Sequence, residues 1–480
     1  MITVRRPNCA RSRGLETNPS VERSAITLLA IALSLLLQAD GFAESSERPP
    51  NVVFMFADDL GYADLACYGH PYARTPALDQ LANDGTRFTR FYVSGVTCCP
   101  SRTGFMTGLH AARFPKYPAG YGFSGQVTVT ELLKTKGYRI GHFGKWHIGP
   151  DVGQDYDVDD YGPEDHSKGD PRGRDASIFD AAVDFIRTNA DRPFYMNVWG
   201  HITHYAVNAP DDQVADFGDV KVDRTDFSKT MQHKFDECEQ IGGSIDAGMR
   251  EYLAEVHALD SHVQRVLQTI DEMGLRDNTI VVFSSDHGPA PVLLAGGKKG
   301  AKEYSANMLG YAGVLRGGKH TQYEGGVRVP FIVRWPGHVK AGRVDRKSVL
   351  SGLDWLPTLC AIARVDRLPE QLDGEDVSAA WFGEDRVRES PLFWRTSSAG
   401  AGPSMLDGHW KFHLGATRRP KVELYDLSTD PSESRNVADQ HADVVSQLLA
   451  KTETWVSGLP KEYQKIGKTD LKTLKREGKK

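Results

Sequence analysis

The chain has 480 residues, 40% of them hydrophobic and 25% charged, with a formal net charge of -5. This length accommodates one large α/β domain with a smaller one, or three domains of ordinary size. The mildly acidic balance argues against a dedicated nucleic-acid-binding protein, which would carry a basic surplus, so we expect no nucleic-acid partner. An anionic substrate would therefore require a local cationic pocket.

Residues 1–43 have the features of an export signal peptide. Several arginines precede a mostly apolar run over 25–37, which at about thirteen residues is too short for the ~20 residues of a membrane span. Small residues at Gly41 and Ala43 predict cleavage after Ala43. The alternatives are an uncleaved anchor or a coding start placed too far upstream. The signal predicts an exported protein, periplasmic or extracellular, with no stable membrane span after cleavage.

The mature chain opens with a predicted strand over 51–57, a continuous apolar run typical of a strand buried on both faces. Two adjacent carboxylates, Asp58 and Asp59, follow this strand directly. A helix is expected to begin at Thr75, with this residue as N-cap, a proline at the first helical position and Gly85 as terminator.

Strands and helices continue to alternate along the chain. We expect helices over 130–136 and 249–273, and strands over 88–93, 138–143, 194–198 and 279–283. This alternation predicts a mostly parallel sheet with helices on both faces. Functional side chains of such sheets gather at the carboxyl ends of the strands. In this sequence those ends carry Asp58, Asp59, Lys145, His204, Asp286 and His287.

The segments 205–248 and 288–320 are long, polar or glycine-rich and show little periodicity, which predicts functional loops or insertions. Beyond about residue 385 the pattern changes to short antiparallel strands over 392–394, 410–414 and 422–427, with a loop over 397–403, a helix over 444–455 and a lysine-rich tail. The expected organisation is a signal peptide over 1–43, a catalytic domain over 44–388 and a C-terminal subdomain over 389–480.

The run CCPSRTGFMTG, which begins at Cys98, has the most specific pattern in the chain. It reads C-x-P-S-R-x-x-x-x-T-G, the pattern in which sulfatases carry the cysteine that is oxidised to formylglycine. A thiol suits sulfate esters poorly because a stable thiosulfonate-type adduct would form, whereas one hydroxyl of an aldehyde hydrate attacks sulfur and the other expels sulfate. The pattern requires one residue between the modified cysteine and the proline, which identifies Cys98, rather than Cys99, as the modified residue. The alternative interpretation is a buried cysteine pair before a proline-capped helix.

Asp58, Asp59 and Asp286 together form an oxygen-rich set suited to a hard divalent cation such as Ca²⁺. Each aspartate alone could instead cap a following helix. Imidazole generally prefers softer ions, so His287 beside this set leaves the identity of the metal open.

With these motifs in place, the chain resembles a type I sulfatase of the alkaline-phosphatase-like superfamily from about Asn51 to Asn436. The resemblance implies a large, mixed, mostly parallel sheet sandwiched by helices, with a smaller C-terminal α+β subdomain that contains a short antiparallel sheet. The motifs that carry it, in the order of the family, are FADDLGYADLACYG, TPALDQLANDGTRFTRFY, CCPSRTGFMTG, GYRIGHFGKWHIG, NTIVVFSSDHG, LRGGKHTQYEGGVRVPFIVRWPG and LYDLSTDPSESRN.

The same resemblance implies roles for individual residues. The metal ligands would be Asp58, Asp59, Asp286 and His287, completed by the hydrate oxygen of the modified Cys98. In the family, the position that corresponds to His287 is asparagine in many members and histidine in others. Arg102 and Ser101 would hold the hydrate, and His147 would orient and deprotonate it.

The resemblance also implies that Lys145, Lys319 and His204 grip the sulfate oxygens, and that Lys319 or His204 protonates the leaving alcohol. His204 departs from the pattern of the family, which is Pro-His-x-Pro, because the sequence around it is Thr-His-Tyr-Ala. His201 is a nearby alternative for this role.

The resemblance predicts a sulfuric ester hydrolase that acts on a sulfated carbohydrate and is matured by a formylglycine-generating enzyme. A phosphonate or phosphodiester hydrolase of the same superfamily is the first alternative. An inactive homologue that binds sulfated glycans is the second, and it is disfavoured because every catalytic residue type is present.

Overall fold

The computed structural model describes Met1 and residues 48–149, 156–160, 170–292, 306–396, 402–415, 422–461 and 463–464. The chain divides into two units, Met1–Arg48 and Pro49–Lys480. The predicted signal peptide lies outside the described residues apart from Met1, so the fold reported is that of the second unit. Among the described residues, no helix has both the length and the apolar character needed to cross a bilayer.

A nine-stranded sheet forms the centre of this unit, in the order β4-β3-β5-β1-β6-β7-β2-β8, with β9 paired to β2. β1 is parallel to β5 and β6, and β3 is parallel to β4 and β5, whereas β7 runs antiparallel to its neighbours β6 and β2. The predicted mixed, mostly parallel sheet is therefore confirmed. The strands are β1 (Asn51–Ala57), β2 (Thr86–Tyr92), β3 (Arg139–Gly144), β4 (Val158–Asp160), β5 (Phe194–Trp199), β6 (Thr279–Ser285), β7 (Arg328–Arg334), β8 (Arg343–Asp345) and β9 (Leu350–Ser351).

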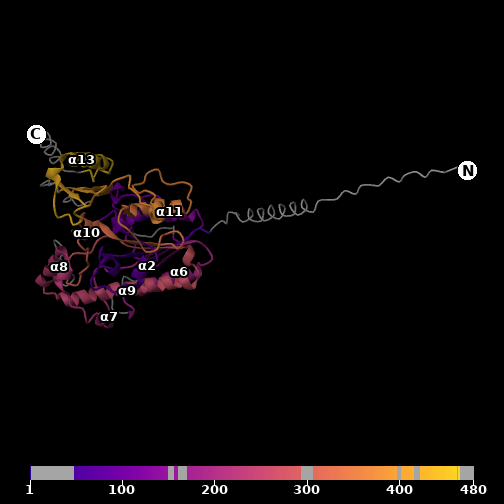
Figure 1. Ribbon diagram of the computed structural model, residues 1–480, viewed down its shortest axis with the longest axis horizontal. Helices are drawn as coiled ribbons and strands as arrows, with labels where there is room; N and C mark the ends of the chain where they lie inside the picture. Colours follow the sequence, from indigo (N-terminus) through magenta and orange to yellow (C-terminus); the bar gives the residue numbers. More distant parts are fainter. Residues whose placement is uncertain are drawn as a thin grey trace. The chain divides into compact units, whose positions relative to one another are not determined.

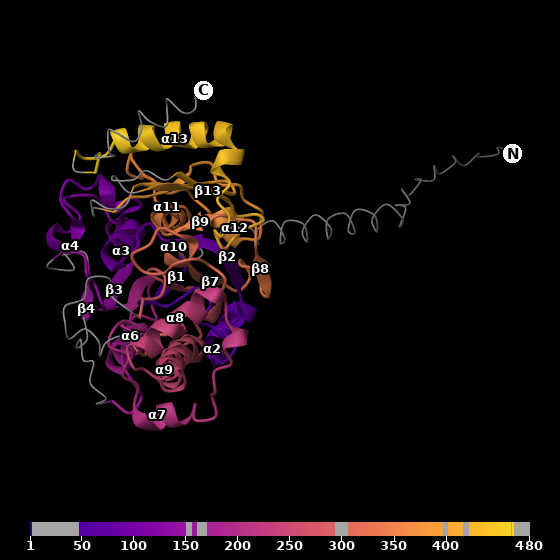
Figure 2. The same cartoon turned by 90° about the vertical axis from the view of Figure 1, so that its left-hand side faces the viewer.

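Helices cover both faces of this sheet, with α2, α6 and α9 on one side and α3 and α11 on the other (Figure 2). Side chains of a strand alternate between faces, so Val53 and Met55 of β1 join the first layer while Phe54 and Phe56 join the second. Each buried phenylalanine contributes about 1.5–3 kcal/mol to folding. This two-sided burial explains why the strand is apolar from Val52 to Ala57. The helices are α2 (Pro76–Asn83), α3 (Cys98–Thr107), α5 (Val129–Lys134), α6 (Ala176–Thr188), α9 (Ile245–Glu272) and α11 (Trp355–Ile362).

The C-terminal part forms a separate antiparallel sheet of four strands, in the order β10-β11-β12-β13, with helix α13 packed across it (Figure 1). The prediction of a short antiparallel sheet followed by a helix is confirmed. The boundary at residue 388 stays a prediction. The strands are β10 (Leu392–Trp394), β11 (Ser404–Asp407), β12 (Trp410–Leu414) and β13 (Val422–Asp426), and the helix is α13 (Ala442–Ser457).

A buried ion pair joins the small sheet to the large one. Lys411 of β12 places Nζ 3.0 Å from Oε1 of Glu324, the first residue of α10 (Glu324–Val327), and neither side chain is exposed. The hydroxyl of Tyr92, at the end of β2, donates to Oε2 of Glu324 over 2.8 Å. Because breaking a buried pair costs about 3–5 kcal/mol, this contact holds the C-terminal sheet beside the strand ends of the central sheet.

Thr75 is the N-cap residue of α2, as expected, but its side chain does not cap the helix. Its hydroxyl accepts a hydrogen bond from the Ala66 N–H, and the carboxylate of Asp260 in α9 caps the helix by accepting from the N–H groups of Ala77 and Leu78. The segment 205–248 is not a structureless loop, because it contains α7 (Asp211–Ala215) and α8 (Lys229–Gln240).

Candidate active site

The acidic segments that follow β1 and β6 lie next to each other, as the sequence predicts. β1 and β6 are adjacent and parallel, with Ala57 opposite Ser285, so the residues that follow each strand lie side by side. The Asp59 N–H donates to Asp286 Oδ1 over 3.2 Å. Asp59 adopts a left-handed φ of 64°, a backbone state that costs about 1–2 kcal/mol for a residue with a side chain and that clusters at functional sites.

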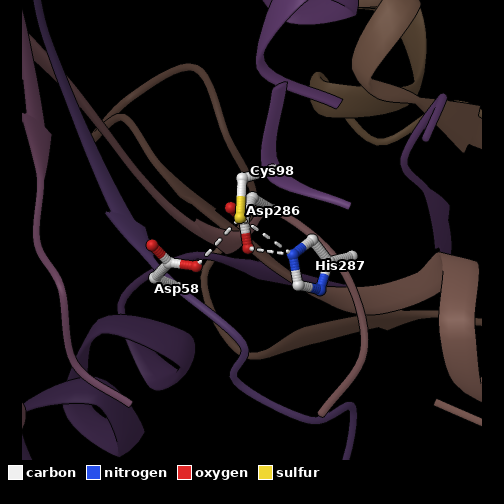
Figure 3. Close-up of side chains that lie close together, drawn as sticks. All are labelled: Asp58, Cys98, Asp286 and His287. Atoms are coloured by element: carbon white, nitrogen blue, oxygen red, sulfur yellow. Dashed lines mark hydrogen bonds and ion pairs between the residues drawn. The ribbon is translucent and has the colours of Figure 1, made fainter. Parts of the chain in front are cut away.

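Cys98 is the first residue of α3 and points into the acidic cluster (Figure 3). Its Sγ lies 3.5 Å from Oδ1 of Asp58 and 3.4 Å from Nε2 of His287. Burial, together with the charges of Asp58 and Asp286, raises the pKa of the Cys98 thiol well above its usual range. The sulfur therefore stands at the centre of the site as a neutral, unactivated thiol.

Arg102 lies one turn further along α3 and is completely buried. Its Nε and Nη2 donate to Oδ2 of Asp286 over 3.1 and 3.0 Å, its Nη1 donates to the carbonyl of Lys145 over 2.8 Å, and Nη2 lies 3.3 Å from Oδ2 of Asp58. Charge-assisted bonds of this kind are among the strongest in proteins. Arg102 therefore clamps the ends of β1, β3 and β6 together.

Two lysine ammonium groups flank the cluster. Lys145, directly after β3, forms an ion pair with Asp58 and donates to Cys98 Sγ over 3.5 Å. Lys319 Nζ donates to both carboxylate oxygens of Asp59, over 2.7 and 2.9 Å. Burial opposes the charge on each lysine, but the neighbouring carboxylates prevail and raise the pKa of both. The site therefore balances three carboxylates with three permanent cations.

His287 provides the clearest test of whether the site fits a metal ion. Its Nδ1 lies 2.9 Å from the carbonyl of Gly288, which can only accept, so the proton of a neutral ring belongs on Nδ1. Nε2 then presents a lone pair, 3.2 Å from Oδ1 of Asp59 and 3.5 Å from Oδ1 of Asp286. Facing acceptors at these distances repel unless a proton or a metal ion lies between them. The donors therefore fit a divalent cation.

The ligand atoms are close enough to share one ion. The candidate ligand atoms of Asp58, Cys98, Asp286 and His287 lie within 4.8 Å of one another, and so do those of Asp58, Asp59, Cys98 and His204. Two of the four ligand atoms in each set are carboxylate oxygens, which are the ligands that hard cations prefer. The structure thus brings His204, the residue that departs from the family pattern, into the cluster.

The alternative residue, His201, is held elsewhere. Its Nδ1 lies 3.1 Å from Oδ1 of Asp175, and Oδ2 of Asp175 accepts hydrogen bonds from the N–H groups of His201 and Ile202. The guanidinium of Arg174 donates to the carbonyls of His204 and Ala206. Arg174 and Asp175 thus position the loop that carries His204. Sequence reasoning missed both, because an aspartate before an apolar helix looks like an ordinary N-cap.

Two further predicted residues lie at the border of the site. Ser101 is buried, and its hydroxyl donates to the carbonyl of Gly95 over 3.1 Å, within the loop that precedes α3. His147 is exposed and has a left-handed φ of 62°, two residues after Lys145. Partial desolvation of its ring by the surrounding protein, together with the charges of Lys145 and Arg102, lowers the pKa of His147. Their roles toward a hydrate stay predictions.

Comparison with known proteins gives a consistent answer. A family model described as sulfatase matches residues 50–365, and one described as N-sulphoglucosamine sulphohydrolase, C-terminal, matches residues 318–456. Arylsulfatase A of Homo sapiens is 31% identical over 468 residues, which cover 86% of this chain and 88% of that protein. An N-acetylgalactosamine-6-O-sulfatase of Bacteroides thetaiotaomicron is 28% identical over 485 residues, covering 84% of this chain and 92% of that protein.

Solved structures share the fold. The structure of Ps i-CgsB in complex with k-i-k-neocarrahexaose superposes with a TM-score of 0.69 at 23% identity, covering 90% of this chain and 98% of that one. At this identity the likeness concerns the fold alone, whereas the family match and the arylsulfatase A relative concern the sequence. Together with the geometry of the site, they show that this chain belongs to the sulfatase family, as a type I sulfatase of the alkaline-phosphatase-like superfamily and a sulfuric ester hydrolase.

Proposed function

We propose that this sulfatase removes sulfate from a sulfated carbohydrate, using a formylglycine formed from Cys98 and a calcium ion bound by Asp58, Asp59, Asp286 and His287. One observation carries the proposal. The sulfur of Cys98 lies among buried carboxylates and beside a lysine ammonium group, at one edge of the sheet. A cysteine of merely structural importance would have no need of such surroundings.

A metal ion, the modified cysteine and the protein would each supply part of the chemistry. The calcium ion, when bound, would supply a Lewis acid, and the formylglycine hydrate would supply the attacking hydroxyl. The protein itself supplies fixed positive charge. A sulfuryl group in transit spreads negative charge over its oxygens, and preorganised ammonium groups in a water-poor site stabilise that charge where it develops. Lys145, whose Nζ lies 3.5 Å from Cys98 Sγ, is placed for this task.

Formal charges support an anionic substrate. The three carboxylates of the cluster are balanced by Arg102, Lys145 and Lys319. A bound divalent cation would leave a positive surplus, which a sulfate ester neutralises, since uncompensated buried charge is costly. With carboxylate oxygens engaged by the cation, the ammonium groups of Lys145 and Lys319 become available for sulfate oxygens. His204, held by the loop between β5 and α7, closes the other side of the cluster.

Several features support a carbohydrate substrate and an exported enzyme. The relatives named above include an N-acetylgalactosamine-6-O-sulfatase and a protein solved with a neocarrahexaose. The N-terminal signal pattern favours export to the periplasm or the outside of the cell, and the motif at Cys98 favours maturation by a formylglycine-generating enzyme. The substrate is therefore expected among sulfated sugars met outside the cytoplasm.

The proposed function is tested by substrate comparison. We expect enzyme produced together with a formylglycine-generating enzyme, and supplied with Ca²⁺, to hydrolyse 4-nitrophenyl sulfate with a kcat/KM at least ~100-fold above that for bis(4-nitrophenyl) phosphate. Sulfate release from a panel of defined sulfated oligosaccharides then identifies the sugar. A preference for the phosphodiester would favour the phosphodiester hydrolase, and tight binding of sulfated oligosaccharides without sulfate release would favour an inactive homologue.

A further inference from the structure

A cavity of about 220 Å³ adjoins the active site on the side of Lys319. Its walls come from helix α8 and from the segments around Pro289 and Tyr311. The volume lies somewhat below the ~300–1,000 Å³ typical of pockets for drug-sized ligands, so it suits a single sugar residue. Lys319 lines the cavity and its ammonium group binds Asp59, so this residue connects the cavity wall with the catalytic cluster.

Lys234 occupies an unusual position on α8. The buried residues of this helix are Met231, Phe235 and Cys238, and they pack in one cluster with Met249 and other residues of α9. Positions 231, 234, 235 and 238 make up the inward stripe of an amphipathic helix, where apolar residues are expected. Lys234 itself is half-buried, so its charge is partly removed from water, which costs stability unless it finds a partner.

The partners that Lys234 finds within the protein are incomplete. Its Nζ donates to the carbonyl of Gly310 over 2.8 Å. An ammonium group has three donors, and among the described residues no other acceptor and no carboxylate within ion-pair distance meets this one. Burial lowers the pKa of Lys234 to about 8, against the opposing charges of Asp64, Glu237 and Asp59. An anion in the cavity would satisfy the remaining donors.

The charges along the cavity wall support an anionic ligand. Lys234 and Lys319 both line it, and Glu237 is its one acidic lining residue in the described part of the chain. The carboxylate of Glu237 lies 3.7 Å from Nε2 of His233, on the exposed side of α8. A sugar whose sulfate ester sits at Lys319 would therefore extend its ring toward a second, unpaired cation.

We infer that this cavity is the subsite for the sugar that bears the cleaved sulfate, and that Lys234 selects sugars with a second anionic group, a sulfate or a carboxylate, near that ester. The inference rests on the proposed function of the same site. It assigns a specificity role to α8, the helix within the segment 205–248 that the sequence predicts to be a functional loop or insertion.

The test measures binding rather than turnover, so that it stays informative if hydrolysis fails. Calorimetric titration of the Cys98→Ala protein with Ca²⁺ present would compare two sugar pairs that differ by one anionic group. The first pair is D-glucosamine 6-O-sulfate and D-glucosamine 2-N,6-O-disulfate. The second is N-acetylgalactosamine 6-O-sulfate and the uronate-containing disaccharide that carries it. A difference in affinity within the first pair identifies the second group as a sulfate, and a difference within the second pair identifies it as a carboxylate.

We expect the dianionic member of one pair to bind more tightly, and Lys234→Met to reduce that preference about tenfold, the effect of one charge-assisted bond. Lys234→Arg should retain most of it. The matched control Lys229→Met, which removes the same charge from an exposed position of α8, should leave the ratio unchanged.

Equal affinity within both pairs, or a Lys234→Met effect that is shared by both members of a pair, would overturn the inference. Failure of wild-type enzyme to hydrolyse 4-nitrophenyl sulfate would instead count against the proposed function.

Discussion

Replacing Cys98 by alanine is expected to lower kcat/KM for 4-nitrophenyl sulfate by about 10⁴-fold or more, as removal of other covalent nucleophiles does. The side chain supplies the attacking oxygen after oxidation, and its position beside Lys145 and Asp58 cannot be taken over by an alanine methyl group. The fold should persist, because the change removes one sulfur atom from the end of a helix. Initial rates of nitrophenolate release and a urea unfolding curve measure the two effects.

The neighbouring cysteine offers a matched control. Cys99 is equally buried, but its Sγ faces Thr103 Oγ1, 3.9 Å away on the next turn of α3. Cys99→Ala should cost about 1 kcal/mol of stability from the small cavity and leave kcat/KM within about twofold of wild type. Full activity of Cys98→Ala, or an equal loss in both variants, would show that Cys98 is not the nucleophile.

The second large effect concerns the metal. Asp59→Asn is expected to raise the Ca²⁺ concentration needed for half-maximal activity by about 100-fold, because a neutral amide replaces a charged ligand of a hard cation. The variant also breaks the contact between Lys319 and two carboxylate oxygens. Activity as a function of free Ca²⁺ measures the effect, and equilibrium dialysis measures metal binding independently of turnover.

Asp64, a second buried carboxylate of the same segment, is the control for this variant. It accepts hydrogen bonds from the Gly61 and Tyr311 N–H groups and from the hydroxyl of Tyr252, and it belongs to neither candidate ligand set. Asp64→Asn should lower stability but not the affinity for Ca²⁺. If both variants bound Ca²⁺ as wild type does, the acidic cluster would not be the metal site.

The sequence was most informative about the centre of the sheet. β1 and β6 are buried on both faces and have apolar centres, so both strands could be recognised, although β6 extends two residues beyond the predicted end at 283. The parallel arrangement then placed Asp58 and Asp286 at one edge. The motif at Cys98 located the third part of the site. Local pattern and a general rule about strand ends were sufficient for this much.

Features that depend on distant contacts could not be read in the same way. The cap of α2 comes from Asp260, far along the chain, and not from the adjacent threonine. Strand β11, which the sequence analysis did not predict, is defined by its pairing with β10 and β12. Helix α8 was missed because Lys234, which lines the cavity beside Lys319, interrupts its apolar stripe.

The clamp formed by Arg102 is a further example. The motif indicated that this arginine belongs to the site, but its partners come from three strands. The bonds to Asp286 and to the Lys145 carbonyl became visible only when the strand ends were assembled. The position of Asp175 behind His201 likewise depends on the start of α6 lying next to the end of β5.

The mass of the peptide that contains Cys98 tests the central claim most directly. The protein should be produced together with a formylglycine-generating enzyme and digested for mass spectrometry. We expect the peptide to be lighter by the difference between a CH₂–SH group and an aldehyde, and to react with a hydroxylamine probe. The fraction of peptide that carries this modification should rise in proportion to the specific activity of the preparation. An intact thiol at Cys98 in a fully active preparation would contradict the proposed chemistry.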